Sequence, residues 1–223
     1  MPAYLSKLGA VLLAAGAMAG VAIAGPNGDG MHEDHDPHAA HNAAMQDDGG
    51  KEVTSADVTL PDTAMFDQTG AERRMASEIV GDRIVVIDFI FTSCTTICPV
   101  TTALMAQADK RLSDVSADDL ALVSVSIDPN TDTPARLTEF AARAKADWTF
   151  LTGQKRIMDD ALVAMDAYST NPEDHAPMII IGDASTGNYV RVFGLPDPAM
   201  IETRVRHLLE MRSKADGGHS HHH

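Results

Sequence analysis

The stretch "IVVIDFIFTSCTTICPV", residues 84–100, decides the fold because a buried strand, two thiols and a helix start follow one another within it. Residues 84–91 form a nearly continuous apolar run rich in β-branched side chains, which is the pattern of a strand covered on both faces. Cys94 and Cys98 are the only cysteines of the 223-residue chain, and a proline follows the second at once. Because proline is tolerated in a first helical turn, we predict a helix over 99–112 that begins beside the thiols.

Apolar patterns in the rest of the chain extend this unit into an α/β fold. With one more strand expected between the second and third helices, the order is β-α-β-α-β-α-β-β-α. Thiols at the junction of a buried strand and its helix in this order indicate a thioredoxin-like fold, with a central mixed sheet flanked by helices. The other predicted elements are a strand at 120–127, a helix from Pro134 capped by Thr133, a helix at 157–167, a hairpin of strands 178–183 and 189–194, and a helix at 199–212.

The first 24 residues have the layout of a secretory signal peptide, with Lys7 before an apolar run at 8–23 and small residues up to Ala24. We expect cleavage after Ala24 and export to the periplasm. The alternative is a retained N-terminal membrane anchor, although the apolar run is short for a helix that must cross roughly 30 Å of hydrocarbon.

Composition divides the remainder into a domain and two tails. Residues 25–51 contain six acidic side chains, one base and no apolar periodicity, so we predict a disordered arm there. Residues 52–213 have the pattern of a single globular domain, and 214–223 form a His-rich, low-complexity tail. The formal net charge of −15 excludes nucleic acid as a partner and favours a basic protein or a cation.

The spacing of the two thiols suits chemistry better than a structural bridge. A disulfide that closes so short a loop adds little stability, although an inert exported bridge is the plain alternative. Side chains four residues apart on a helix lie on one side, with α-carbons about 6 Å apart, close enough to chelate one ion or to form a disulfide. A helix N-terminus favours thiolate, and thiolates select Cu(I) over hard cations.

Three motifs follow one another at 91–102 ("FTSCTTICPVTT"), 126–140 ("SIDPNTDTPARLTEF") and 173–181 ("EDHAPMIII"). Together they resemble the Sco (SenC) family of exported copper chaperones, which help to assemble the binuclear copper site of cytochrome oxidase. The resemblance covers about residues 55–212. It implies a metallochaperone that holds one copper ion, as Cu(I) or Cu(II), and delivers it to the copper-site subunit of an oxidase or reduces the thiols there. Other exported copper carriers or thiol reductases are further partners that it implies.

The resemblance makes His175 the copper-binding histidine beside Cys94 and Cys98. In a thioredoxin-like fold the loop before the "PMIII" strand lies beside the helix start, which agrees with this role. Of the other candidates, His207 falls off the apolar face of its helix and is predicted to lie on the surface. Asp128 and Asp132 suit turn and cap positions, in a loop that the resemblance places near the metal.

Asp88 interrupts the apolar strand six residues before Cys94, the offset at which thioredoxins keep a buried aspartate that handles protons. A buried carboxylate without a role is costly. It favours an alternative function, that of an exported thiol:disulfide oxidoreductase in which Cys94 attacks and Cys98 resolves. Three residues between the thiols, rather than two, argue against ordinary thioredoxin chemistry.

The arm offers flexible imidazoles and thioethers, which bind Cu(II) and Cu(I) respectively. A third possibility is therefore a passive copper buffer, in which the tails hold most of the metal. Methionines at core-like helical positions (Met105, Met158 and Met165) are predicted to serve packing instead. The candidate auxiliary ligands in the arm are Met31, His32, His35, His38, His41 and Met45.

Overall fold

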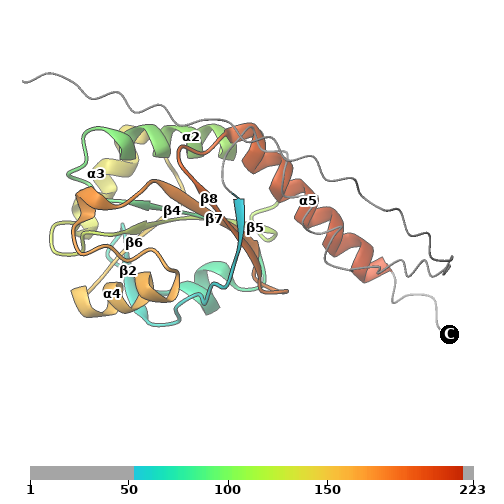
Figure 1. Ribbon diagram of the computed structural model, residues 1–223, viewed down its shortest axis with the longest axis horizontal. Coiled ribbons are helices and arrows are strands. Elements are labelled where there is room, and N and C mark those ends of the chain that lie inside the picture. The colour runs from blue at the N-terminus through green and yellow to red at the C-terminus, as the bar shows by residue number, and fades with distance from the viewer. Residues whose placement is uncertain (1–52, 218–223) are drawn as a thin grey trace, which may run out of the picture. The chain divides into compact units, whose positions relative to one another are not determined.

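The computed structural model describes residues 53–217, which contain a mixed sheet with the strand order β1-β8-β7-β4-β5-β6-β2-β3 (Figure 1). The central strand β4 pairs in parallel with β5 and antiparallel with β7. The strands are β1 (Val53–Ala56), β2 (Ala64–Asp67), β3 (Glu72–Arg74), β4 (Ile84–Ile90), β5 (Leu120–Ser126), β6 (Thr149–Thr152), β7 (Met178–Asp183) and β8 (Asn188–Phe193).

Helices cover both faces of the sheet. In Figure 1, α2, α3 and α5 lie over one face and α4 lies over the other, so the sheet forms the middle of three layers. The helical segments are η1 (Met75–Val80), α2 (Ile97–Arg111), α3 (Pro134–Ala144), α4 (Lys155–Ala164), η2 (Pro172–Asp174) and α5 (Pro198–Gly217).

Every side chain of β4 is buried, as its apolar sequence predicts for a central strand. Because successive side chains of a strand point to opposite faces, β4 contributes to two cores. Val86 and Ile90 join the core under α2, α3 and α5, while Ile87 and Phe89 join the core under η1 and α4. Asp88 is two residues from both Val86 and Ile90, so its side chain points to the same face as theirs, the face covered by α2.

The predicted thioredoxin-like arrangement is confirmed in its central elements. Strands β4, β5, β7 and β8 and helices α2 to α5 lie where the sequence patterns place them, and the Thr133 side chain caps α3 by accepting a hydrogen bond from the Arg136 amide at 3.3 Å. Three helices differ in their boundaries: α2 begins at Ile97, before the proline, α4 covers Lys155–Ala164 in place of 157–167, and α5 continues to Gly217. The strands β1 to β3, of which β1 and β3 are the edges of the sheet, and the segments η1 and η2 were not predicted.

The first described strand begins at the end of the sheet where β4 finishes. Val53 of β1 pairs with Val192 of β8, and the neighbouring Phe193 pairs with Met178 at the start of β7. Since β7 runs antiparallel to β4, the start of β7 lies beside the end of β4. The first residue of β1 therefore lies at the same end of the sheet as the loop that follows β4.

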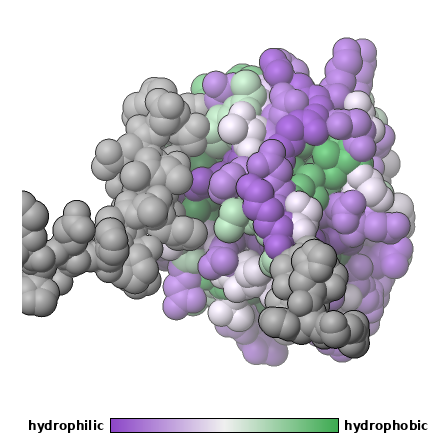
Figure 2. All heavy atoms as spheres, turned by 90° about the vertical axis from the view of Figure 1, so that its right-hand side faces the viewer, coloured by the Kyte–Doolittle hydropathy of each residue, from purple (hydrophilic) through white to green (hydrophobic). Residues whose placement is uncertain are grey.

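The surface shown in Figure 2 carries mainly hydrophilic residues, with small hydrophobic areas between them. Within residues 53–217, no helix combines the length and the apolar character needed to cross a membrane. The predicted signal segment, the arm and the last residues of the tail lie outside the described residues.

Candidate metal and thiol site

The two thiols stand where β4 ends and α2 begins. Cys94 is partly exposed in the connecting loop, whereas Cys98, in the first turn of α2, is 4% exposed. The Cys98 amide donates a hydrogen bond to Cys94 Sγ at 3.3 Å, and the Cys94 amide donates to the Phe91 carbonyl at 3.2 Å. Both cysteines are free thiols. The start of α2 thus holds the Cys94 sulfur over its own first turn.

The environments of the two thiols push their pKa values apart. Partial burial of Cys94 opposes ionisation, but hydrogen bonds from the Cys98 thiol and from the backbone amides of Cys98, Thr96 and Ile97 outweigh it and lower the pKa of Cys94. Burial, together with the neighbouring Cys94, raises the pKa of Cys98 to about 12. Cys94 is therefore the thiol of the pair that ionises more readily.

Asp88 is fully buried on the α2 face, the face that Cys98 also packs against. Its Oδ1 accepts a hydrogen bond from Ser124 Oγ at 2.5 Å, and Ser124 Oγ in turn accepts one from Trp148 Nε1 at 2.9 Å. Its Oδ2 has no hydrogen-bond partner. Burial raises the pKa of Asp88 to about 7, against the opposing effect of Ser124.

Asp88 also acts on the thiols through its charge. A negative Asp88 contributes to the raised pKa of Cys98. Asp88 and Cys98 both lie on the α2 face of the sheet, and a charged Asp88 makes ionisation of Cys98 less favourable. A carboxyl group that titrates near neutral pH, with one free oxygen, is suited to take and return a proton there.

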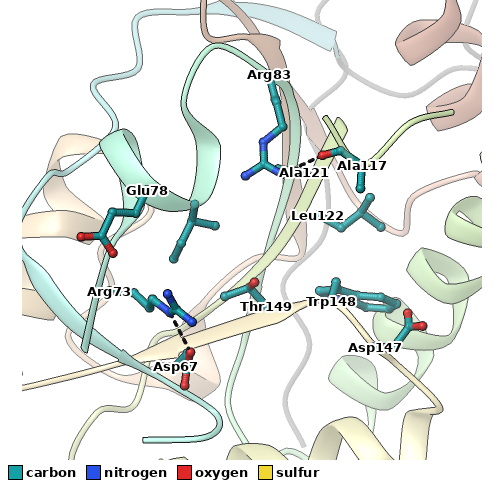
Figure 3. Close-up of a pocket in the computed structure, with 11 residues that line it drawn as sticks. Asp67, Arg73, Glu78, Arg83, Ala117, Ala121, Leu122, Asp147, Trp148 and Thr149 are labelled. Carbon is teal, nitrogen blue, oxygen red and sulfur yellow. Dashed lines mark hydrogen bonds and ion pairs between the residues drawn. The ribbon is translucent and has the colours of Figure 1, made fainter. Parts of the chain in front are cut away.

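Trp148 also lines a pocket of about 390 Å³, shown in close-up in Figure 3. Arg83 and Thr149 in its lining mark the beginnings of β4 and β6, so this pocket lies at the opposite end of the parallel strands from the thiols. Its arginines are already engaged: Arg73 pairs with Asp67 at 3.1 Å, and Arg83 donates to the Ala117 carbonyl at 2.9 Å. Among the described residues that line this pocket, no free cation is therefore left to bind a ligand.

His175 follows η2 and precedes β7, beside the end of β4. Its ring is partly buried and lies 5.7 Å from the ring of Phe89, centroid to centroid. Burial lowers the pKa of His175, so its imidazole is neutral and available as a ligand around pH 7. Among residues 53–217, however, no three His, Cys, Asp or Glu side chains are gathered around a common point as metal ligands. The structure brings the loop of His175 to the site without completing a three-ligand set.

Asp132 has a role that sequence reasoning missed. It is 1% exposed, and its Oδ1 accepts hydrogen bonds from the Thr92 amide at 2.9 Å and from Thr92 Oγ1 at 2.5 Å, while Oδ2 accepts one from Ser126 Oγ at 2.6 Å. Asp132 thus ties the loop after β5 to the loop that carries Cys94. It is not the helix cap, because Thr133 is. Asp128 is the turn residue that the pattern predicted, and its carbonyl accepts from the Asp132 amide at 2.9 Å.

The remaining candidates divide into confirmed predictions and residues that the structure does not describe. His207 is exposed on α5, and Met105, Met158 and Met165 are completely buried, as predicted. The auxiliary ligands proposed in the arm lie outside the described residues; they are Met31, His32, His35, His38, His41 and Met45.

Comparison with known protein families gives one match, to a family described as SCO1/SenC, over residues 52–190. The SCO1 protein homolog of Bacillus subtilis is 36% identical over 112 residues, which is 48% of this chain and 58% of that protein. Protein SenC of Rhodobacter capsulatus is 32% identical over 143 residues, which is 61% of this chain and 59% of that protein. The chain thus spans less than two thirds of the length of these relatives.

Solved structures agree with the fold. One of them is the structure of BsSco, described as a member of the Sco family of cytochrome c oxidase assembly proteins with a disulfide switch. Its sequence is 25% identical, and it superposes with a TM-score of 0.58 over 69% of this chain and 94% of that chain. Yeast Sco1 with copper bound is 22% identical, with a TM-score of 0.56 over 70% of this chain and 94% of that chain. These similarities confirm the thioredoxin-like fold.

Proposed function

Because the chain belongs to the SCO1/SenC family, we propose that it is an exported copper metallochaperone that holds one ion through Cys94, Cys98 and His175. The observation that carries this proposal is the pair of free thiols at the start of α2, one with a lowered pKa, with a neutral imidazole in the adjacent loop. Thiolates are soft ligands that suit Cu(I), and an imidazole added to them suits Cu(II). Copper is the cargo, delivered to the copper-site subunit of a respiratory cytochrome oxidase.

The ligand set requires a movement of one side chain. The two cysteines are close together, whereas His175 packs against Phe89 and is not assembled with them. We infer that Cu(I) binds first to the two thiols, and that the His175 ring turns from Phe89 towards the ion when Cu(II) is held. A carrier benefits from a third ligand that engages and releases, because the ion must leave for the target.

Replacing His175 with alanine is expected to abolish or shift the intense sulfur-to-copper charge-transfer band of the reduced protein with Cu(II). Cu(I) binding by the two thiols should persist, because imidazole is the harder of the available ligands. Absorption spectroscopy and competitive Cu(I) titration measure the two effects. His207→Ala is the matched control, since His207 is exposed on α5, away from the site. A Cu(II) spectrum that is the same in both variants would remove His175 from the site.

A second function is favoured by Asp88. Its buried, partly unpartnered carboxyl group beside Cys98 is of little use to a pure copper carrier. It suits a thiol:disulfide reductase in which Cys94 attacks a partner disulfide and Cys98, losing its proton, resolves the mixed disulfide. We propose that Asp88 accepts that proton.

Asp88→Asn is expected to slow the reduction of a partner disulfide near neutral pH by about tenfold or more, a typical effect of losing general base assistance. The measurement is the rate of disulfide reduction by the prereduced protein, with copper affinity determined in parallel. Copper affinity should change much less, because Asp88 is not a proposed ligand. Asp118→Asn, an exposed surface substitution, is the control. If Asp88→Asn reduced disulfides at the normal rate but bound copper poorly, Asp88 would be a support of the metal site and the reductase function would lose its basis.

A further inference from the structure

Cys94 also lines a groove on the side formed by α2 and α3. This groove has a volume of about 520 Å³, within the range of small-molecule sites, and His175 is not among the residues around it. Its apolar part consists of Pro99 and Ala103 of α2 and Phe140 and Ala144 of α3. The Cys94 sulfur is thus accessible from a direction different from that of the proposed copper ligand.

The groove carries positive charge on an otherwise acidic protein. Arg143 and Lys145, at the end of α3, line it, and no acidic residue does. Within the described part of the chain neither forms an ion pair with an acidic side chain, although seven other arginines and two other lysines do so with partners such as Asp67 and Glu202. Two unpaired cations beside a nucleophilic sulfur are therefore available to a ligand, on a chain with a net charge of −15.

The structure orients the Arg143 side chain and fixes the backbone of Lys145. The Arg143 guanidinium lies over the Phe140 ring, 6.0 Å from its centroid, so its stem covers the apolar floor. Lys145 ends α3 with a φ of 57°, in the left-handed region where helices usually place glycine or asparagine. The backbone of Lys145 is therefore fixed by the helix end, at the rim of the groove.

We propose that this groove binds a small disulfide or thiol that carries carboxylates, and presents its sulfur to Cys94. The charges of Arg143 and Lys145 match two carboxylates, and the apolar floor accommodates the methylene groups between them. A ligand of tripeptide size fits the volume, whereas a folded partner does not enter it. The site goes beyond copper binding, because it requires only the reduced thiols.

The reaction in the groove is a two-electron exchange. The Cys94 thiolate attacks one sulfur of the ligand disulfide, the ligand S–S bond breaks, and one ligand thiolate leaves and takes up a proton. Cys98 then loses its proton and attacks Cys94 Sγ, which releases the second ligand thiol. The protein dithiol is oxidised to a disulfide and the ligand disulfide is reduced to two thiols. In the reverse direction, two molecules of the anionic thiol reduce the protein disulfide back to the dithiol and form the ligand disulfide.

The test compares three small disulfides on the reduced, copper-free full chain: glutathione disulfide, which is anionic, hydroxyethyl disulfide, which is neutral, and cystamine, which is cationic. The variant Arg143→Gln/Lys145→Asn removes both charges, while glutamine keeps the stem over Phe140 and asparagine tolerates the left-handed backbone. The control Lys110→Gln/Arg156→Gln removes two exposed charges elsewhere. Rates of Cys94 modification are followed by mass spectrometry of quenched samples.

We expect the groove variant to react about tenfold more slowly with glutathione disulfide, at normal rate with the neutral disulfide, and no more slowly with cystamine. About 1 M salt should remove the difference.

The normal rate with hydroxyethyl disulfide shows that the variant is folded and its thiols intact. Equal rates of the groove and control variants with glutathione disulfide would overturn the proposal. The proposal would also be overturned if the two substitutions left the rate with glutathione disulfide unchanged while an acidic peptide blocked the reaction. That result would mean that the groove binds a segment of a protein. Copper titration of the same variants is separate, so failure here leaves the metallochaperone proposal standing.

Discussion

Oxidation of Cys94 and Cys98 to a disulfide is expected to lower the copper affinity of the domain by more than about a hundredfold. The reason is that the same two sulfurs cannot chelate an ion once they are bonded to each other, and loss of ligands exceeds the 10–100-fold effect of losing the groups that orient them. The free thiols, with a Cys98 amide already directed at Cys94 Sγ, are close enough for the bond to form readily. Copper should conversely protect both thiols from alkylation.

Competitive Cu(I) titration of the reduced and the oxidised protein, with thiol counting before each run, measures this effect. Equal affinities in the two states would mean that the metal is bound elsewhere, as in the passive-buffer hypothesis. A variant with His32, His35, His38 and His41 replaced by alanine then distinguishes the two binding regions. It should retain the redox-dependent site and lose only redox-independent copper.

Asp88→Asn is expected to stabilise the reduced protein increasingly as pH rises from about 4 to 7. In the unfolded chain this carboxyl group titrates near 3.8, whereas burial raises its pKa in the folded protein to about 7. Below pH 4 the group is protonated in both states and costs nothing. Between these pH values only the unfolded state has released the proton, so the free energy of unfolding falls by about 1.4 kcal/mol per pH unit. Above pH 7 the loss levels off at a total on the order of 4 kcal/mol.

Urea unfolding of wild type and Asp88→Asn across pH 4 to 8 measures this difference. The asparagine variant cannot ionise, so its advantage over wild type should grow through that interval and then remain constant. Asp118→Asn, in an exposed turn, should show no such growth. A constant difference between Asp88→Asn and wild type over the whole range would mean that Asp88 does not have a raised pKa. Together with the expected slower disulfide reduction, a stabilising Asp88→Asn would identify a residue kept for chemistry at the expense of stability.

The central part of the fold could be predicted because it depends on local patterns. The runs that form β4 and β5 are apolar and β-branched throughout, and the Thr133 cap precedes a proline in the usual way. The missed strands are short: β3 is three residues long with every side chain exposed, so no alternation marks it, and β2 is four residues long, too short for its alternation to stand out. The strands β1 and β2 form by pairing with β8 and β6, which lie far away in the sequence, so their own sequences do not reveal them.

The site was predictable to the extent that its residues are adjacent in sequence. The spacing of Cys94 and Cys98, and the intrusion of Asp88 into an apolar strand, are visible in one short stretch. The bond between Asp132 and Thr92 joins residues 40 positions apart, and the groove combines α2 with the end of α3. Such contacts arise only when the sheet brings these elements together, so the pattern of "DPNTDTP" indicated turn and cap positions but not the bond from Asp132 to Thr92.

The pairing of β1 with β8 fixes where the His- and Met-rich arm is attached to the domain. Val53 lies at the thiol end of the sheet, three strands away from β4, a lateral distance of about 14 Å at the usual strand spacing. The 12 residues from His41 to Val53 span at most about 40 Å when fully extended, which sets the upper limit on the distance between His41 and the start of β1. Confinement within such a radius corresponds to an effective concentration in the millimolar range. If the arm binds copper, as the passive-buffer hypothesis holds, the ion is presented to the thiols at about that concentration, however scarce copper is in the surrounding solution.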